Sequence, residues 1–362
     1  MAQEYKVVLL VLGAFALAGL LSFWLTPHVS EFAHKVGAMD IPKDGRRMHK
    51  KPTPRMGGLA IFMGFLVALL TFATMDVQML SILLGAMIIV VLGIFDDIVA
   101  LGAKFKFCIQ IIAAAIPVCI GGLKIEFFTS FNPFSDNPYF SLGYLAIPVT
   151  IIWIVGITNA VNLIDGLDGL AAGVSSIAAL TMLAVGLLTN EIMVAITMAA
   201  IAGSCLGFLP YNFNPAKIFM GDTGSTFLGF MLATMSIVGF FKFYAVISFA
   251  VPFLVLGLPI FDTASAIARR LLEGRSPMSP DRGHVHHKLV DMGFNVKQSV
   301  AILYAISGTL GLAAVILTTS GEAKAMILIL AVILVMAVGG RILWGLQKSI
   351  QARKEQENDG KN

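Results

Sequence analysis

Long apolar runs, separated by short polar gaps, dominate this chain of 362 residues. Hydrophobic residues make up 57% of the chain and charged residues only 13%, whereas an ordinary soluble domain has about 25% charged residues. A soluble fold of this size cannot cover its surface with so few charges, and a disordered chain lacks this apolar content. A membrane β-barrel would show short alternating segments instead of long runs. We therefore predict an all-α polytopic membrane protein.

Eleven apolar runs are long enough to cross a bilayer, which takes about 20 residues. The predicted spans are 6–26, 57–75, 78–95, 106–122, 143–161, 168–188, 191–209, 223–241, 244–267, 298–319 and 323–345. The first run is too long for an ordinary signal peptide, and no small-residue cleavage site follows it, so we expect it to be retained. Residues 1–345 are interpreted as one integral-membrane domain and 346–362 as a polar cytoplasmic tail.

Basic residues predict the orientation, because cytoplasmic loops carry an excess of Lys and Arg. With the flanking span ends, one side of the membrane holds 21 of the 25 basic residues, and the other side holds only Lys6, Lys124, Lys242 and Lys324. The N-terminus is therefore expected outside and the C-terminus in the cytoplasm. The basic side comprises the tail and the loops 27–56, 96–105, 162–167, 210–222 and 268–297.

Six carboxylates lie at span ends that this orientation places in the cytoplasm. They are Asp96, Asp97, Asp165, Asp168, Asp222 and Asp262. Charged groups at membrane depth are costly and usually functional. Hard oxygen ligands of this kind suit Mg²⁺, which keeps waters and bridges phosphates. Convergence of these groups predicts a cation site at the membrane surface, with ordinary polar caps or solvated loop residues as the alternative.

Two of these acidic segments have a regular pattern. In NAVNLIDGLDG a polar group recurs at every third position, and on a helix such groups form one slowly drifting polar face. In FMGDTGS, Asp222 precedes an apolar run, as at a helix N-terminus whose N–H groups can meet phosphate oxygens. A DTG triplet also occurs in aspartic proteases, but that chemistry needs a second matching aspartate, and FDTAS at 261–265 lacks the glycine.

Basic groups gather in the last long loop, which carries SPDRGHVHHKL. Within seven residues it holds Arg282, His284, His286, His287 and Lys288. Imidazole and guanidinium donors can hold a pyrophosphate, so we interpret this loop as an anion site. A zinc site would lack the usual Cys or distant partners, and a solvated basic loop is the other alternative.

Further basic groups lie near the Asp96–Asp97 pair. Lys104 and Lys106 separate that pair from the fourth span, within reach of a lipid phosphate, and the loop DGRRMHKKPTPRMGG can attract anionic headgroups. Carboxylates for a metal and cations for phosphates thus share one predicted face, which fits a phosphate substrate processed at the membrane surface. Two other classes stay open: a secondary transporter, whose ionisable groups usually lie near the bilayer midplane, and an aromatic-substrate prenyl transferase, whose usual Asn-Asp-x-x-Asp runs are absent.

Five motifs appear in a fixed order between about residues 40 and 295: DGRRMHKKPTPRMGG, GIFDD, NAVNLIDGLDGLAAG, YNFNPAKIFMGDTGS and PDRGHVHHKLVDMGF. Together they resemble the polyprenyl-phosphate N-acetylhexosamine-1-phosphate transferase family, of glycosyltransferase 4 type. HVHH preceded by PDRG favours the WecA/TagO branch, since the MraY translocases tend to have three consecutive histidines. Ala100 stands where many relatives carry another charged residue, so a third carboxylate is absent there.

The resemblance implies a Mg²⁺-dependent enzyme, with Mn²⁺ as a substitute, at the cytoplasmic face of a bacterial plasma membrane. It would transfer GlcNAc-1-phosphate from UDP-GlcNAc to undecaprenyl phosphate, release UMP and begin the synthesis of teichoic acid, lipopolysaccharide or another envelope polysaccharide. The implied partners are a UDP-N-acetylhexosamine donor, the lipid acceptor and the bilayer, with no nucleic acid, and a homodimer is common among relatives. A phospho-MurNAc-pentapeptide translocase activity is the alternative within the family.

The resemblance also assigns roles to single residues. Asp222 matches the metal-binding aspartate, and Asp97 is expected to share the metal. Catalytic roles are expected for Asp96, Asp97, Asp165, Asp168 and His284. Substrate-binding roles are expected for Lys106, Asn159, Asn162, Asn212, Arg282, His286 and His287.

Overall fold

The computed structural model describes residues 2–41, 52–129, 139–240, 246–276 and 283–320, together with Lys324 and Leu330. The predicted span 323–345, apart from those two residues, and the tail 346–362 lie outside the described residues. The first half contains the helices α1 (Ala2–Val36), α2 (Gly58–Phe72), α3 (Val77–Val99), α4 (Ala103–Cys119) and α5 (Ala146–Leu163), with the short 3-10 turn η1 (Gly143–Leu145). The second half contains α6 (Leu170–Leu188), α7 (Ile192–Asn212), α8 (Gly221–Phe240), α9 (Val246–Val255), α10 (Gly257–Leu272), α11 (Val285–Asp291) and α12 (Val296–Ser320).

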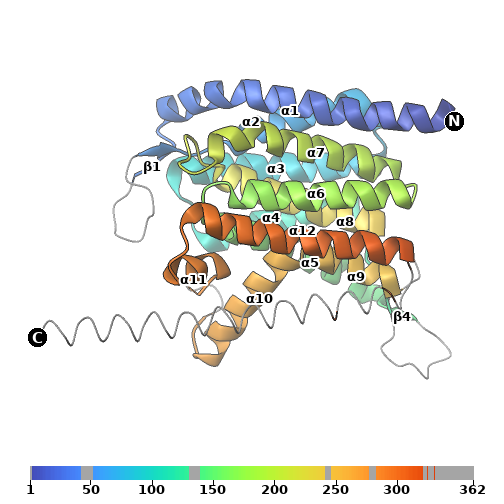
Figure 1. The fold of residues 1–362 in the computed structure, drawn as a ribbon. Coiled ribbons are helices and arrows are strands. Elements are labelled where there is room, and N and C mark those ends of the chain that lie inside the picture. The colour runs from blue at the N-terminus through green and yellow to red at the C-terminus, as the bar shows by residue number, and fades with distance from the viewer. Residues whose placement is uncertain are drawn as a thin grey trace, which may run out of the picture.

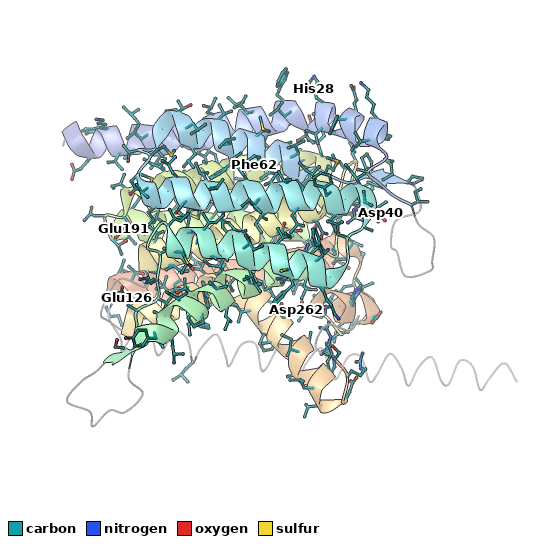
Figure 2. All side chains as sticks on the ribbon, turned by 180° about the vertical axis from the view of Figure 1, so that it is seen from behind. His28, Asp40, Phe62, Glu126, Glu191 and Asp262 are labelled. Atoms are coloured by element: carbon teal, nitrogen blue, oxygen red, sulfur yellow. The ribbon has the colours of Figure 1, made fainter. Side chains whose placement is uncertain are left out.

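The long helices lie side by side, and short elements mark the two ends of the bundle (Figure 1). At one end β1 (Met39–Asp40) pairs antiparallel with β2 (Thr53–Pro54), and α11 lies at this end too. At the other end β3 (Phe127–Thr129) pairs antiparallel with β4 (Tyr139–Ser141). Figure 2 shows Asp40 at the first end and Glu126 and Glu191 at the opposite one. We call the end that carries β1 and α11 the loop end.

Seven helical segments among the described residues are long and apolar enough to cross a membrane. They are Glu4–Val36, Val77–Val99, Gly143–Leu163, Leu170–Leu188, Ile192–Asn212, Gly221–Phe240 and Val296–Thr319. The predicted spans 57–75 and 106–122 correspond to the shorter helices α2 and α4. The prediction of an all-helical, multi-pass membrane protein is thereby confirmed.

Two predicted spans differ from the observed helices. The first helix continues beyond residue 26 to Val36, so the loop predicted at 27–56 starts as helix. The predicted span 244–267 is not one continuous helix, because α9 ends at Val255 and α10 begins at Gly257. Pro259 has no N–H to donate to the carbonyl of Val255, which weakens the helix at that turn. In Figure 1, α10 slants away from the bundle toward the loop end.

Helix α8 occupies the centre of the bundle, and its apolar stretch is buried along its whole length. Two glycines let the neighbouring helices approach its first turn. A Cβ on Gly58 of α2 would lie 2.0 Å from the backbone nitrogen of Gly224, and one on Gly93 of α3 would lie 2.4 Å from the Cα of Thr223. Because glycine has no Cβ, the backbones can touch there. The end of α3 is thereby held against the start of α8.

Candidate active site

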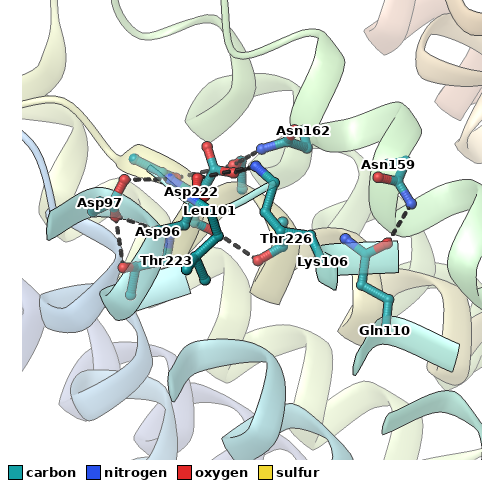
Figure 3. A network of polar contacts seen from close by, with 12 residues as sticks. Asp96, Asp97, Leu101, Lys106, Gln110, Asn159, Asn162, Asp222, Thr223 and Thr226 are labelled. Atoms are coloured by element: carbon teal, nitrogen blue, oxygen red, sulfur yellow. Dashed lines mark hydrogen bonds and ion pairs between the residues drawn. The ribbon is translucent and has the colours of Figure 1, made fainter. Parts of the chain in front are cut away.

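The carboxylate of Asp97 caps the start of α8 (Figure 3). Its Oδ1 accepts the backbone N–H of Asp222 at 3.0 Å, and its Oδ2 accepts the N–H and the hydroxyl of Thr223 at 3.1 and 2.7 Å. The first N–H groups of a helix have no partner within the helix, so a carboxylate placed there is stabilising. These two N–H groups therefore serve a buried carboxylate of the protein, instead of the phosphate oxygens that the sequence suggested.

Lys106 joins the other two carboxylates of the cluster. Its Nζ lies 3.0 Å from Asp96 Oδ2 and 2.7 Å from Asp222 Oδ2, and Asp96 Oδ1 accepts the N–H of Leu101 at 2.7 Å. The chain reverses between α3 and α4 at Ala100, which has a left-handed backbone conformation with φ 54°. After this reversal α4 runs back along α3, which brings Lys106 next to Asp96 and Asp222.

Arg55 enters the same cluster from a distant part of the chain. The segment around it pairs with the segment before α8: the N–H of Phe219 donates to Pro54 at 2.8 Å, and the N–H of Gly57 donates to Phe219 at 2.9 Å. Arg55 Nη2 then lies 3.3 Å from Asp97 Oδ1 and 3.7 Å from Asp222 Oδ1. The sequence placed Arg55 only among the basic residues of its loop, although its PRMGG context was part of a motif.

We call Arg55, Asp96, Asp97, Lys106 and Asp222 the acidic cluster. Its three carboxylates face two cations, and all five side chains lie at the loop end of the bundle. Asp222 is 17% exposed and Lys106 27% exposed, whereas the side chain of Asp97 has no exposed surface. Solvent and solutes therefore reach Asp222 and Lys106, while Asp97 lies beneath them.

The polar face predicted over NAVNLIDGLDG is helical only in its first half. Asn159 donates to Gln110 Oε1 at 2.7 Å and Asn162 donates to Ser225 Oγ at 2.8 Å, both from α5. Helix α5 ends at Leu163, so Asp165 and Asp168 lie in the loop before α6 and not on one helical face. The three-residue period was therefore wrong as a description of this second half.

Asp168 and Asn212 hold loops together. Asp168 Oδ2 accepts the side-chain amide of Asn214 at 2.9 Å and the N–H of Ala216 at 3.0 Å. Asn212, which is 3% exposed, accepts the N–H of Gly169 at 3.0 Å and donates to Ile218 at 2.9 Å. These contacts tie the loop before α6 to the segment before α8, and the site roles predicted for Asp168 and Asn212 stay predictions.

The environment of Asp165 brings the protonation of its carboxylate close to neutral pH. Removal from water raises its pKa to about 7, and the negative charges of Asp222 and Asp97 add to this effect, while Arg55 opposes it. A group that titrates near the working pH can hold or release a proton during a reaction. This pKa is compatible with the catalytic role predicted for Asp165, which stays a prediction.

The histidines of the last loop pack against this region. His284 and His286 stack at 5.7 Å with 9° between their planes, and the rings of His286 and His287 are 4.3 Å apart. A Cβ on Gly166 would lie 2.3 Å from His286 Nε2, so α11 touches the loop that carries Asp165. Burial lowers the pKa of His286 to about 4, so its ring is neutral at pH 7. Arg282 lies outside the described residues.

The donor set of the acidic cluster fits Mg²⁺ that is completed by its substrate. Among the described residues, no group of three or more His, Cys, Asp or Glu is arranged to hold a metal. Mg²⁺ bound together with phosphates needs only one or two carboxylates. Lys106 contacts both Asp96 and Asp222, and Arg55 lies 3.7 Å from Asp222, whereas both oxygens of Asp97 accept hydrogen bonds from α8. Asp222 with Asp96 therefore fits the metal better than the predicted pair of Asp222 with Asp97.

Comparison with known proteins agrees with this geometry. The profile of glycosyl transferase family 4 matches residues 79–240, which include most of the acidic cluster. A Bacillus subtilis protein named "Probable undecaprenyl-phosphate N-acetylglucosaminyl 1-phosphate transferase" is 42% identical over 326 residues, 90% of each chain. The "Decaprenyl-phosphate N-acetylglucosaminephosphotransferase" of Mycolicibacterium smegmatis is 34% identical over 89% of this chain and 86% of its own.

A relative of the other branch is less similar. The "Phospho-N-acetylmuramoyl-pentapeptide-transferase" of Clostridium beijerinckii is 31% identical over 83% of this chain and 94% of its own. The similarity over nearly the whole chain leaves no room for the transporter or the aromatic prenyl transferase as the class of protein. The chain belongs to glycosyl transferase family 4 and lies in its WecA/TagO-like branch rather than with the MraY-type enzymes.

Proposed function

We propose that the protein transfers GlcNAc-1-phosphate from UDP-GlcNAc to undecaprenyl phosphate, releasing UMP and forming undecaprenyl-pyrophosphate-GlcNAc. The observation that carries this proposal is the acidic cluster, in which Lys106 bridges Asp96 and Asp222 while Arg55 adjoins Asp97. Both substrates carry phosphates, and the cluster offers metal-binding oxygens and phosphate-binding cations side by side. The names of the Bacillus and Mycolicibacterium relatives, which both specify N-acetylglucosamine and a polyprenyl phosphate, support the choice of substrates.

In the proposed reaction an oxygen of the lipid phosphate attacks the β-phosphorus of UDP-GlcNAc. The bond from this phosphorus to the oxygen it shares with the α-phosphorus breaks, and UMP leaves with that oxygen. The second pKa of a phosphate monoester is about 6, so the attacking group is already mostly a dianion at pH 7. A strong general base is therefore not required, and the main task is to bring two anions together.

The residues of the cluster divide this task. Asp222 and Asp96 would hold Mg²⁺, which when bound neutralises the pyrophosphate of the donor and the charge that develops on UMP. Arg55 and Lys106 would donate hydrogen bonds to phosphate oxygens, which such cations bind strongly. Asp165, whose pKa is about 7, would accept the proton of any acceptor phosphate that arrives as a monoanion. His284 would hold the donor from the side of α11, and Arg282 would add a guanidinium donor to its phosphates.

The contacts of the two adjacent aspartates favour direct transfer over a covalent aspartyl-phosphate. Asp97 accepts three hydrogen bonds from α8, and Asp96 accepts from Leu101 and Lys106. A carboxylate nucleophile would first have to leave these donors. Incubation with UDP-GlcNAc labelled in its β-phosphate, without lipid acceptor, should leave the protein unlabelled. A phosphorylated aspartate that is trapped and then discharged by lipid phosphate would overturn direct transfer.

We also propose that the loop end faces the cytoplasm, in a plasma-membrane protein with eleven spans and an external N-terminus. The predicted cytoplasmic loops, with the flanking span ends and the tail, hold 21 of the 25 basic residues, and an excess of Lys and Arg is typical of cytoplasmic loops. Cysteine substitutions at Glu191 and at Lys104, which lie toward opposite ends, test the proposal in intact cells. A membrane-impermeant thiol reagent should label the first site, and labelling of the second alone would contradict the orientation.

The proposed activity is tested by UMP release from purified protein with undecaprenyl phosphate and Mg²⁺. UDP-GlcNAc should be the best donor, ahead of UDP-GalNAc and UDP-MurNAc-pentapeptide, and a preference for the pentapeptide donor would refute the assignment. Asp222→Asn should lower kcat by at least about 100-fold, since a metal ligand is lost. Glu191→Gln makes the same acid-to-amide change at the opposite end of the bundle and should leave kcat unchanged.

A further inference from the structure

One buried contact of the histidine loop lies outside the acidic cluster. Asp262 of α10 accepts a hydrogen bond from His284 Nδ1 on its Oδ2 at 2.8 Å, and accepts the backbone N–H of Val285 on its Oδ1 at 2.8 Å. Asp262 is 2% exposed and His284 5% exposed. Figure 2 labels Asp262 on α10, the helix that slants away from the bundle. The break after α9 is thus what brings this carboxylate to the start of α11.

This contact determines which nitrogen of His284 carries hydrogen. An ionised carboxylate can only accept hydrogen bonds, so Nδ1 of His284 has to be the donor in this contact. Nε2 is then the nitrogen that accepts a proton, or donates one once the ring is charged. The second oxygen of Asp262 holds the backbone of Val285, so both the ring and the chain that bears it are fixed. Carboxylates behind functional histidines commonly orient the ring in this manner.

The stacked rings of His284 and His286 connect Asp262 to the loop that carries Asp165. His284 stacks nearly parallel on His286, and His286 packs against Gly166 in the loop of Asp165. His286 is 3% exposed, and its Nε2 has no hydrogen-bond partner among the described residues. Asp262 therefore reaches the loop of Asp165 through two stacked rings.

We propose that Asp262 is a positioning residue for the phosphate transfer, which holds His284 in its Nδ1–H form and so presents Nε2 to the phosphates of the bound substrates. The presentation to substrate rests on the proposed function, whereas the fixed tautomer does not. The ligand that Nε2 would meet is a phosphate group: the charged ring donates a hydrogen bond to an anionic oxygen, and the neutral ring accepts one from a protonated oxygen. Asp262 itself contacts neither substrate nor metal in this account.

The test combines a spectroscopic signature of His284 with steady-state kinetics. In protein labelled with ¹⁵N-histidine, the His284 signals, assigned by their loss in His284→Gln, should show a protonated Nδ1 and an unprotonated Nε2 near pH 8. Asp262→Asn places an amide nitrogen against one of the two N–H donors, so the signals should change to a mixture of tautomers. In the UMP-release assay kcat should fall about 10–100-fold, the range typical of such supporting residues.

Two further variants separate positioning from mere stability. Asp262→Glu keeps the carboxylate and should recover part of the kcat together with the Nδ1–H signature. Asp291→Asn removes an exposed acid at the end of α11 and should change neither. Wild-type His284 found with hydrogen on Nε2, or an Asp262→Asn protein with unchanged tautomer and kcat, would overturn the proposal. If wild-type protein released no UMP, the proposed function would fail while the tautomer measurement would still decide the role of Asp262.

Discussion

Asp97 at the end of α3 holds Thr223 in the first turn of α8 by two hydrogen bonds, 3.1 Å from its N–H and 2.7 Å from its hydroxyl. This contact joins the segment GIFDD to the segment GDTGS, which are 125 residues apart in the chain between Asp97 and Asp222. Asp97 therefore connects the two helices on which the other carboxylates of the cluster lie. Its substitution should affect both the fold and the reaction.

Thr223→Val tests this connection without touching a carboxylate. The variant removes one of the three hydrogen bonds that the buried Asp97 accepts from α8, and we expect it to lower the free energy of unfolding by about 1–3 kcal/mol. Thermal unfolding in detergent measures the change as a lower Tm. Thr223→Ser keeps the hydroxyl and serves as the control. Equal Tm values for valine, serine and wild type would contradict the capping role.

Gly93→Ala tests the close approach of α3 and α8. The added Cβ would lie 2.4 Å from the Cα of Thr223, so the helices must separate and the acidic cluster must widen. Overpacking of this kind costs about 1–3 kcal/mol or more, and UMP release should fall with it. Gly156→Ala in α5 is the matched control, because its Cβ meets nothing within 4 Å. A fully active, fully stable Gly93→Ala protein would refute the packing described here.

Lys106→Gln tests the bridge between Asp96 and Asp222. Without the ammonium these carboxylates lose their shared counterion, and the phosphates lose a donor, so kcat/KM in the UMP-release assay should fall about 10–100-fold. Lys106→Arg should retain more activity than the glutamine variant. Lys104→Gln removes an exposed charge two residues away and should have little effect. If Lys104 proved as important as Lys106, the assignment of the bridge would be wrong.

Asp165→Asn should stabilise the protein in a pH-dependent manner while impairing the reaction. Because the folded pKa of about 7 exceeds the ordinary 3.8, the folded state retains a proton that the unfolded chain has lost. Stability therefore falls as the pH rises from about 4 to 7, and the full cost is present above pH 7. This difference in pKa corresponds to about 4 kcal/mol in the free energy of unfolding. Because Asp165 is only partly buried, we expect roughly half of that value.

Thermal unfolding at several pH values measures this effect. The asparagine variant should have the higher Tm at pH 8, and its advantage should shrink as the pH approaches 4. Its kcat should be reduced, since an amide cannot take up a proton. A variant that is less stable than wild type at pH 8 would show that ionised Asp165 is well solvated or paired.

Much of the fold was predictable because membrane helices have a strong local signature. The apolar runs correspond to helices, the motifs supplied the carboxylates of the acidic cluster and the histidines, and the position of Lys106 just after the Asp96–Asp97 pair indicated its place in the site. The break between α9 and α10 also had a signal, in Pro259, but the run of apolar residues concealed it. The end of α5 at Leu163 was missed because a three-residue polar period fits a helix and an irregular loop equally well.

Long-range contacts could not be predicted in this way. Arg55 reaches Asp97 through backbone pairing between the segments of Pro54 and Phe219, and such pairing leaves no pattern in either segment alone. The contact of Asp262 with His284 depends on the direction of α10, which follows from packing. The structural role of Asn212 likewise depends on two backbone groups, the N–H of Gly169 in the loop before α6 and the carbonyl of Ile218.

The fate of the donor's β-phosphate distinguishes the transfer of a sugar phosphate from the transfer of the sugar alone. Purified protein is incubated with Mg²⁺, undecaprenyl phosphate and UDP-GlcNAc that carries ³²P in its β-phosphate. We expect the label to move into the organic-soluble lipid, with one UMP released for each labelled lipid formed. Label that stays in water as UDP while GlcNAc enters the lipid would contradict it.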